Sequence, residues 1–272
     1  MKNIRWGLVL YTILGIFALV GIGVLMSLIN HKDVAQVCSS LKVNIEGKET
    51  FIDQQDISKM VNNQFGTLIG RDLQKIKFEA IERAIEKLPY VSKAEIHADM
   101  DGTVSVNVQQ REVILRIINR DGREFYVDTE GHKIPVTLKY VPHVLVANGQ
   151  IRESYTKPLE EVQTKMVHDL IHLVNFVKGN ELWENQIVQI YVNEQNDIEL
   201  IPRIGKEVLV IGNADALEYK LNRLEMYYKN ILPKVGTEAY AKVNVKYGGQ
   251  IICERRVGWY MDSLQMKINM KN

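Results

Sequence analysis

Two histidines in the second half of the chain have the spacing of a metal site. His168-Asp169-Leu170-Ile171-His172 places two imidazoles four residues apart, so a helix would present both on one face with a carboxylate between them. This resembles H-E-x-x-H, in which two histidines bind zinc and the glutamate acts as general base. Here Asp169 is one methylene shorter than glutamate, and no third ligand follows at an obvious spacing. The alternative is that His168 and His172 are polar residues beside the apolar stripe of an amphipathic helix.

Other catalytic motifs are missing from the sequence. It contains no G-x-S-x-G nucleophile elbow, no G-x-x-x-x-G-K-[ST] phosphate loop and no C-x-x-C pair. Acidic pairs such as Glu160-Glu161 occur, but their position in the chain does not place two carboxylates in one cleft. We therefore expect a protein without enzymatic activity, cofactor or metal, whose function lies in binding.

An uncharged segment near the N-terminus has the length of a transmembrane helix. Residues 7–29 carry no charged side chain, and at about 1.5 Å per residue such a helix crosses a bilayer core of about 30 Å. Lys2 and Arg5 precede the segment, which predicts a cytoplasmic N-terminus and an exported remainder. The alternative is a cleaved signal peptide, but the apolar run exceeds the usual length of about 7 to 15 residues and no small-residue cleavage site follows it.

The remainder of the chain has balanced charge. Leaving out Lys2 and Arg5 reduces the 34 basic residues to 32, against 33 acidic residues. Because the basic residues are also scattered, the sequence predicts no nucleic-acid partner. Cys38 and Cys253 are the two cysteines, and we expect separate thiols rather than a disulfide framework.

The first part of the exported region is predicted to be a β-α-α-β-β unit. Apolar and polar residues alternate in the segments expected to be strands, and Asp101-Gly102 is a hairpin turn. Apolar residues recur at helical spacing between the first and second strands. The expected elements are a strand at 41–45, a helix after Asp53, a helix ending at Pro89, and strands at 92–98 and 103–109.

The second part is predicted to be a mixed β-sheet domain with flanking helices. The expected elements are a helix at 158–177, strands at 187–193, 198–202 and 207–211, a helix capped by Asn213-Ala214-Asp215 and ended by Pro233, and strands at 241–247 and 250–255. Gly248-Gly249 predicts a tight hairpin between the last two strands. We expect the final strand to be the last in its sheet, with one edge unpaired.

This order of elements and several short motifs resemble a known family. Leu88-Pro89-Tyr90-Val91 is similar to the l-P-[WY]-V signature at the end of the second helix of POTRA domains. The remaining matches resemble the FtsQ/DivIB family of bacterial cell-division proteins, and they are Gln110-Arg111-Glu112-Val113, Phe125-Tyr126-Val127-Asp128, Gly212-Asn213-Ala214-Asp215 and Val243-Asn244-Val245-Lys246-Tyr247. Gln110, Val113, Asn244 and Lys246 depart from the family's usual residues. The resemblance covers nearly the whole chain.

The expected organisation joins a membrane helix to an exported α+β region. Its parts are a cytoplasmic tail at 1–6, a transmembrane helix at 7–29, a linker at 30–40, a POTRA-like domain at 41–112, a C-terminal β domain at 113–256 and a tail at 257–272. The resemblance implies a single-pass inner-membrane protein of the division septum, with its C-terminal region outside the cytoplasm.

The resemblance also implies a partner and a binding site. Proteins of this family are non-catalytic scaffolds that link early and late division proteins and bind the FtsB/FtsL (DivIC/FtsL) pair. In them FtsB is added as a strand to the C-terminal edge, where the helix that precedes the last two strands also takes part. The residues implied at this edge are Tyr247, Gln250, Ile251, Ile252, Cys253 and Arg255. Tyr247 occupies the family's aromatic position, whereas Arg255 stands where some members have an aromatic residue, and Trp259 is a candidate to replace it. Core packing is the alternative interpretation of Tyr247 and Ile251.

Two other functions remain open. A POTRA protein of secretion or outer-membrane assembly would share the first domain, but only one such unit is visible and no membrane-barrel region follows. A membrane-anchored metallohydrolase would use His168 and His172, and bound zinc that is lost on His172→Ala would favour it.

Overall fold

The computed structural model describes residues 6–30 and 36–258, and between 6 and 30 it describes the side chains of residues 14–26. Helix α1 (Trp6–Asn30) covers the uncharged segment 7–29. Within the described residues, no helix meets the length and apolarity needed to cross a membrane. Most of the expected tails at 1–6 and 257–272, including Trp259, and part of the expected linker at 30–40 lie outside the described residues.

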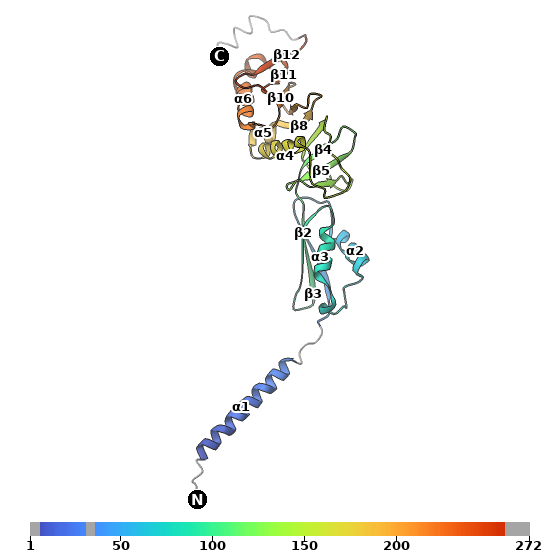
Figure 1. Cartoon of the computed structure of the whole chain (residues 1–272), viewed down its shortest axis with the longest axis vertical. Helices are drawn as coiled ribbons and strands as arrows, with labels where there is room; N and C mark the ends of the chain where they lie inside the picture. The colour runs from blue at the N-terminus through green and yellow to red at the C-terminus, as the bar shows by residue number, and fades with distance from the viewer. Residues whose placement is uncertain (1–5, 31–35, 259–272) are drawn as a thin grey trace. The chain divides into compact units, whose positions relative to one another are not determined.

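The chain divides into two compact units (Figure 1). The first contains the described residues up to Asn44, α1 among them, and the segments 54–85 and 94–108. The second contains the segments 45–53 and 86–93 and the described residues from Gln109 onward. Residues 45–53 and 86–93 lie within the expected first domain, and they group with the second unit because their aromatic side chains pack there. Phe51 stacks on Tyr90 at a centroid distance of 4.9 Å and meets Tyr140 edge-on at 5.0 Å.

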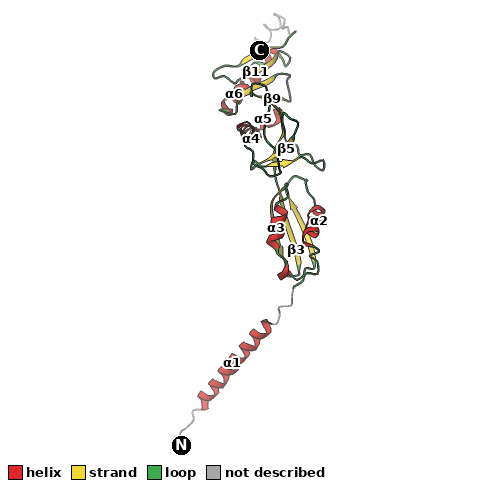
Figure 2. Ribbon diagram, turned by 45° about the vertical axis from the view of Figure 1, so that its right-hand side comes forward, coloured by secondary structure: helices red, strands yellow, loops and turns green. Residues whose placement is uncertain are grey.

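The predicted β-α-α-β-β order is confirmed in the first part of the chain. Its elements are β1 (Ser40–Glu46), α2 (Gln54–Phe65), the 3-10 helix η1 (Leu73–Lys75), α3 (Phe78–Glu86), β2 (Val91–Ala98) and β3 (Thr103–Gln110). The strands form a three-stranded sheet in the order β1-β3-β2, and Figure 2 shows α2 and α3 beside it. Helical spacing buries Ile81 and Ile85 of α3, while alternation buries Val104, Val106 and Val108 of β3.

The hairpin between β2 and β3 follows from its turn residues. Asp101 accepts the main-chain N–H of Thr103 at 2.8 Å, and Gly102 adopts a φ of +84°, which glycine tolerates. The turn therefore forms where the sequence predicts it.

The second unit is built on a nine-stranded mixed sheet in the order β12-β11-β10-β9-β8-β7-β4-β5-β6. The strands are β4 (Val113–Ile118), β5 (Glu124–Asp128), β6 (Lys133–Pro135), β7 (Leu145–Gly149), β8 (Ile187–Val192), β9 (Ile198–Pro202), β10 (Val208–Gly212), β11 (Tyr240–Asn244) and β12 (Ile252–Arg255). The helices are α4 (Lys165–Lys178), α5 (Glu181–Gln186), α6 (Leu217–Asn230) and α7 (Leu232–Val235). One apolar core joins the strands to α4, α5 and α6, with Trp183 and Tyr227 among its largest buried side chains.

The helix expected to begin at residue 158 begins instead at Lys165, so that prediction was wrong. Leu159 adopts a φ of 62°, and Val162 donates its main-chain N–H to Gly131 at 3.0 Å. Pairing with a distant segment therefore replaces the first turns of the expected helix. Thr164 caps the actual helix, because its hydroxyl accepts the N–H of Val167 at 3.4 Å.

Two other local predictions in this unit were wrong. Asn213 and Asp215 do not cap α6: they bond to each other, and Ala216 stands at the N-cap position with no side-chain cap. Gly248-Gly249 does not form a tight hairpin, because β11 ends at Asn244 and β12 begins only at Ile252. Gln250 and Ile251 therefore precede the last strand.

Candidate partner-binding edge

Strand β12 is an open edge of the nine-stranded sheet. It pairs antiparallel with β11, with Cys253 opposite Val243, and no described strand lies on its other side. Arg256 donates its main-chain N–H to Ala239 at 3.0 Å, toward β11. Because the main-chain groups of successive strand residues point to opposite sides, those of Cys253 and Arg255 face the open side. The edge thus presents donors and acceptors that another strand can use.

The opposite edge of the sheet, at β6, is covered by the chain itself. Lys133 donates its main-chain N–H to Glu160 at 2.9 Å, and Leu159 donates its N–H to the oxygen of Lys133 at 2.9 Å. His132 also forms a bridge with Glu161. Of the two edges of the described sheet, only β12 therefore has its main chain open, as expected for the last strand.

The predicted edge residues divide into an exposed and an inward-facing set. Ile252 is 44% exposed, and Gln250 and Arg255 are also exposed. Ile251 and Cys253 pack against the core, which supports the core-packing alternative for Ile251. Burial raises the pKa of the Cys253 thiol, so this group stays protonated and unreactive near neutral pH.

Tyr247 lies in the loop between β11 and β12 and is 49% exposed. Its main-chain oxygen accepts Nη1–H of Arg223 at 2.8 Å. Lys246 lies beside it, with Nζ 5.8 Å from the ring centroid of Tyr247 and 2.8 Å from Asp197. The hydrogen bond to Asp197 raises the pKa of Lys246, which keeps a positive charge next to the tyrosine. The core-packing alternative does not hold for this side chain.

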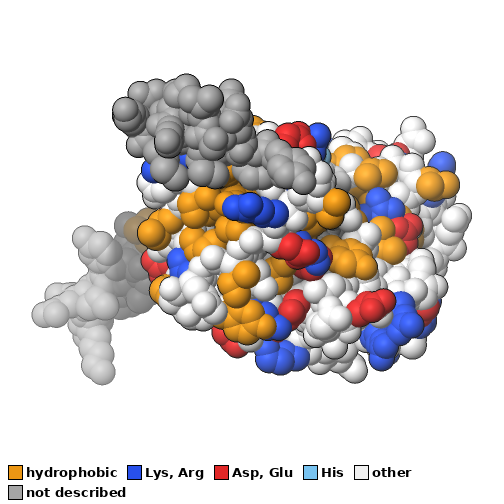
Figure 3. Space-filling model, turned by 90° about the horizontal axis from the view of Figure 1, so that it is seen from above, with side chains coloured by type: hydrophobic (Ala, Val, Ile, Leu, Met, Phe, Trp, Pro, Cys, Tyr) orange, Lys and Arg blue, Asp and Glu red, His pale blue; other side chains and the backbone are white. Residues whose placement is uncertain are grey.

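Helix α6 contributes residues that the sequence reasoning missed. Tyr219 is 49% exposed, and its hydroxyl oxygen accepts the main-chain N–H of Gly249 at 3.0 Å. Met226 is 56% exposed on the same helix. The signal in the sequence is two large apolar residues seven positions apart, which lie on one helix face. A view onto the C-terminal end shows hydrophobic side chains gathered in patches between charged ones (Figure 3).

His168 and His172 are both exposed on α4. The intervening Asp169 is engaged elsewhere on the helix, because Nζ of Lys165 lies 2.7 Å from its carboxylate. The histidines therefore share a helix as predicted, and the described residues bring no further ligand to them.

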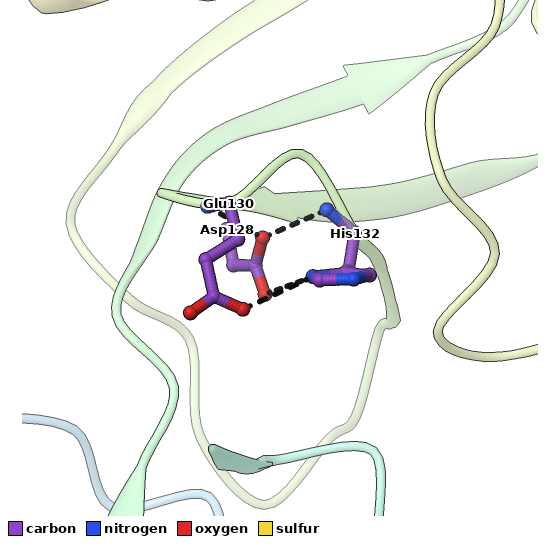
Figure 4. Close-up of side chains that lie close together, drawn as sticks. All are labelled: Asp128, Glu130 and His132. Carbon is purple, nitrogen blue, oxygen red and sulfur yellow. Dashed lines mark hydrogen bonds and ion pairs between the residues drawn. The ribbon is translucent and has the colours of Figure 1, made fainter.

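A different cluster has the spacing of a metal site. Asp128 ends β5, and Glu130 and His132 follow in the turn after it. The ligand atoms of the three lie within 4.8 Å of one another (Figure 4). Nη1 of Arg111 lies 2.8 Å from Asp128, 3.0 Å from Glu130 and 3.3 Å from His132. The guanidinium therefore occupies the place that a metal ion would take, and the cluster is held together by an arginine.

Comparison with known proteins assigns both parts of the chain. Residues 36–109 match the POTRA-like domain model, and residues 112–254 match the model described as FtsQ/DivIB, C-terminal related. The cell division protein FtsQ of Corynebacterium glutamicum is 24% identical over 144 residues, which cover 53% of this chain and 60% of that protein. The matched part thus spans less than two thirds of the relative.

These matches agree with the order of elements seen in both units and with the motifs in the sequence. The C-terminal model alone covers just over half of the chain, from residue 112 to residue 254. The chain therefore belongs to the FtsQ/DivIB family.

Proposed function

We propose that the chain is a non-catalytic scaffold of the bacterial division septum that binds an FtsB/FtsL (DivIC/FtsL) pair by adding a strand of the partner to β12. The observation that carries the proposal is the open main-chain edge of β12, because the other edge of the same sheet is covered by residues 159–161. Strand addition draws its affinity from main-chain hydrogen bonds and its specificity from neighbouring side chains.

The side chains around the edge suit an apolar or aromatic residue of the partner. Ile252, Tyr247 and Tyr219 are each between 44% and 49% exposed. Large apolar side chains gathered at one edge favour a binding surface over plain solvent exposure. Each main-chain hydrogen bond contributes about 1 kcal/mol net to binding. Burial of these side chains must therefore supply the larger share of the binding free energy.

Residues 7–29 are proposed to hold the scaffold in the inner membrane, with the C-terminal region outside the cytoplasm. Support comes from the uncharged sequence and from the exposed apolar side chains of α1, among them Leu14, Phe17 and Leu25. Resistance of the full chain to alkaline carbonate extraction is expected. Release into the soluble fraction would contradict the anchor and leave the edge proposal standing.

The strand-addition proposal is tested by proline at the edge. Arg255→Pro removes a main-chain N–H that faces the open side, and edge strands accept proline at such positions. Arg255→Ala is the matched control, because it removes the same side chain and keeps the N–H. We expect Arg255→Pro to weaken FtsB binding by about tenfold, which is 1.4 kcal/mol, while Arg255→Ala binds as the parent does. Equal binding by both variants would refute strand addition at this edge.

The cellular role is tested by depletion. Loss of the protein is expected to give long filaments with segregated chromosomes and arrested septa. Normal septation with outer-membrane proteins missing would instead support the secretion or assembly alternative.

A further inference from the structure

A pocket in the second unit is lined by arginines. It has a volume of about 450 Å³ and lies between the turn Asn119–Arg123, which joins β4 to β5, and the segment Ile151–Ser154. In the sheet, β4 is six strands away from β12, or roughly 29 Å at the usual strand spacing. The pocket is therefore separate from the partner-binding edge.

The walls of the pocket are fixed. The side-chain amide of the buried Asn119 donates Nδ2–H to the main-chain oxygen of Glu153 at 2.6 Å. Its Oδ1 accepts the main-chain N–H of Glu153 at 3.1 Å. Arg120 donates its main-chain N–H to Ile151 at 2.9 Å. These bonds tie the two wall segments together, so the pocket keeps its shape without a ligand.

The charges of the pocket do not balance. Arg123 is paired with Asp121 at 2.6 Å, and the carboxylate of Glu153 is paired with the buried Lys133 at 2.7 Å. Arg120 and Arg152 are exposed, and their guanidinium groups have no hydrogen bond or ion pair within the described part of the chain. Two guanidiniums at the rim of one pocket are therefore left to bind an anion.

We propose that this pocket binds a short acidic peptide segment of a second partner protein, with Arg120 and Arg152 holding its carboxylates. Arginine suits carboxylates because its planar group donates two parallel hydrogen bonds. The pair of Arg123 and Asp121 at the same rim shows a guanidinium that already holds a carboxylate, with two nitrogens on its Oδ2. The formal charge of the whole chain is only +1, which favours a short acidic segment over a long polyanion as the ligand. The volume is in the range of binding pockets, about 300 to 1,000 Å³.

The test uses a fluorescein-labelled hexaglutamate peptide and the full chain in detergent at low salt, followed by fluorescence anisotropy. Arg120→Glu/Arg152→Glu should weaken binding by at least about tenfold. The matched control is Lys59→Glu/Arg83→Glu, which makes the same change in net charge on exposed residues of the first unit, and it should change binding by less than about twofold. An equal loss in both variants, or no binding to the parent chain, would overturn the proposal.

Two further measurements identify the kind of anion that binds and the arginines that bind it. Inorganic phosphate should displace the peptide far less well than unlabelled hexaglutamate does, and equal displacement would overturn the peptide as ligand. In the parent chain, hexaglutamate should slow phenylglyoxal modification of Arg120 and Arg152 and leave Arg83 unchanged, as read by mass spectrometry. This readout decides the question if the double variant does not fold. FtsB binding involves neither arginine, so failure of either proposal leaves the other intact.

Discussion

The guanidinium group of Arg223 donates Nη1–H to the main-chain oxygen of Tyr247 at 2.8 Å and to that of Val245 at 3.3 Å. Arg223 is 7% exposed and lies on α6, with its guanidinium carbon 5.1 Å from the ring centroid of Tyr219. One buried side chain thus ties the helix to the loop that precedes β12. The position of Tyr247 depends on this contact rather than on a tight turn.

Arg223→Ala is expected to weaken FtsB binding by about tenfold, because the loop that carries Tyr247 loses its anchor and must be ordered on binding. The variant loses hydrogen bonds to a charged group, each worth about 1.5 to 3 kcal/mol, so some loss of stability accompanies it. Arg223 is a positioning residue, and Arg223→Lys should restore part of the affinity by bonding to one oxygen. Glu218→Ala, at an exposed position on the same helix, is the control. Unchanged affinity in Arg223→Ala would refute the anchoring role.

The sequence predicts the elements well where local pattern and tertiary packing agree. Strands 187–193, 198–202 and 207–211 correspond to β8, β9 and β10 within a residue, because short apolar runs bounded by turn residues suit strands that are buried along most of their length. Leu159 and Val162 fit the helical pattern but pair with Lys133 and Gly131 instead. Helical spacing cannot report such a pairing, because the partner lies elsewhere in the chain.

The candidate site, too, could be predicted from the sequence only in part. The edge position of the last strand follows from the order of elements, and the structure confirms it. The contacts of Arg223 and Tyr219 with the loop could not be predicted, because the sequence favours a tight turn at Gly248-Gly249 and gives no sign that α6 holds this segment. The arginine at the centre of Asp128, Glu130 and His132 was missed for a similar reason: Arg111 is far from them in the sequence.

Removing one partner of the buried ion pair between Lys133 and Glu153 is expected to destabilise the second unit strongly. Both side chains are fully buried, and Nζ lies 2.7 Å from Oε1. Lys133→Met leaves the carboxylate buried without its cation, which costs about 3 to 5 kcal/mol of unfolding free energy. Denaturation followed by the fluorescence of the buried Trp183, with Trp6 and Trp259 replaced by Phe, measures it. Lys165→Met, at an exposed position, should cost less than about 1 kcal/mol.

Acid should destabilise the same unit. Burial raises the pKa of Glu153, but hydrogen bonds from Lys133, Thr164 and Gln163 outweigh it and hold the pKa below its usual value of 4.5. A carboxyl group whose pKa is lower in the folded chain than in the unfolded chain stabilises the fold at every pH above its pKa in the unfolded chain. This stabilisation is lost as the pH falls through the pKa of the group in the folded chain. The unfolding free energy should therefore drop from about pH 4.5 downward, and more steeply in the parent chain than in Glu153→Gln. Parallel curves would exclude Glu153 as the main source of acid sensitivity.

Chelation of metal ions should leave the thermal stability of the chain unchanged, because Arg111 already supplies the cation between Asp128, Glu130 and His132. Neither a chelator nor equimolar zinc is expected to move the thermal unfolding midpoint of the parent chain. Arg111→Met removes the guanidinium and frees the three ligand atoms, which lie within 4.8 Å of one another in the parent chain. Zinc should then raise the midpoint, since an ion that binds only the folded state stabilises it by mass action. The gain should vanish in Arg111→Met/His132→Ala. Zinc stabilisation of the parent chain itself would show that the arginine yields to a metal, and the interpretation of this cluster as a salt-bridge centre would fail.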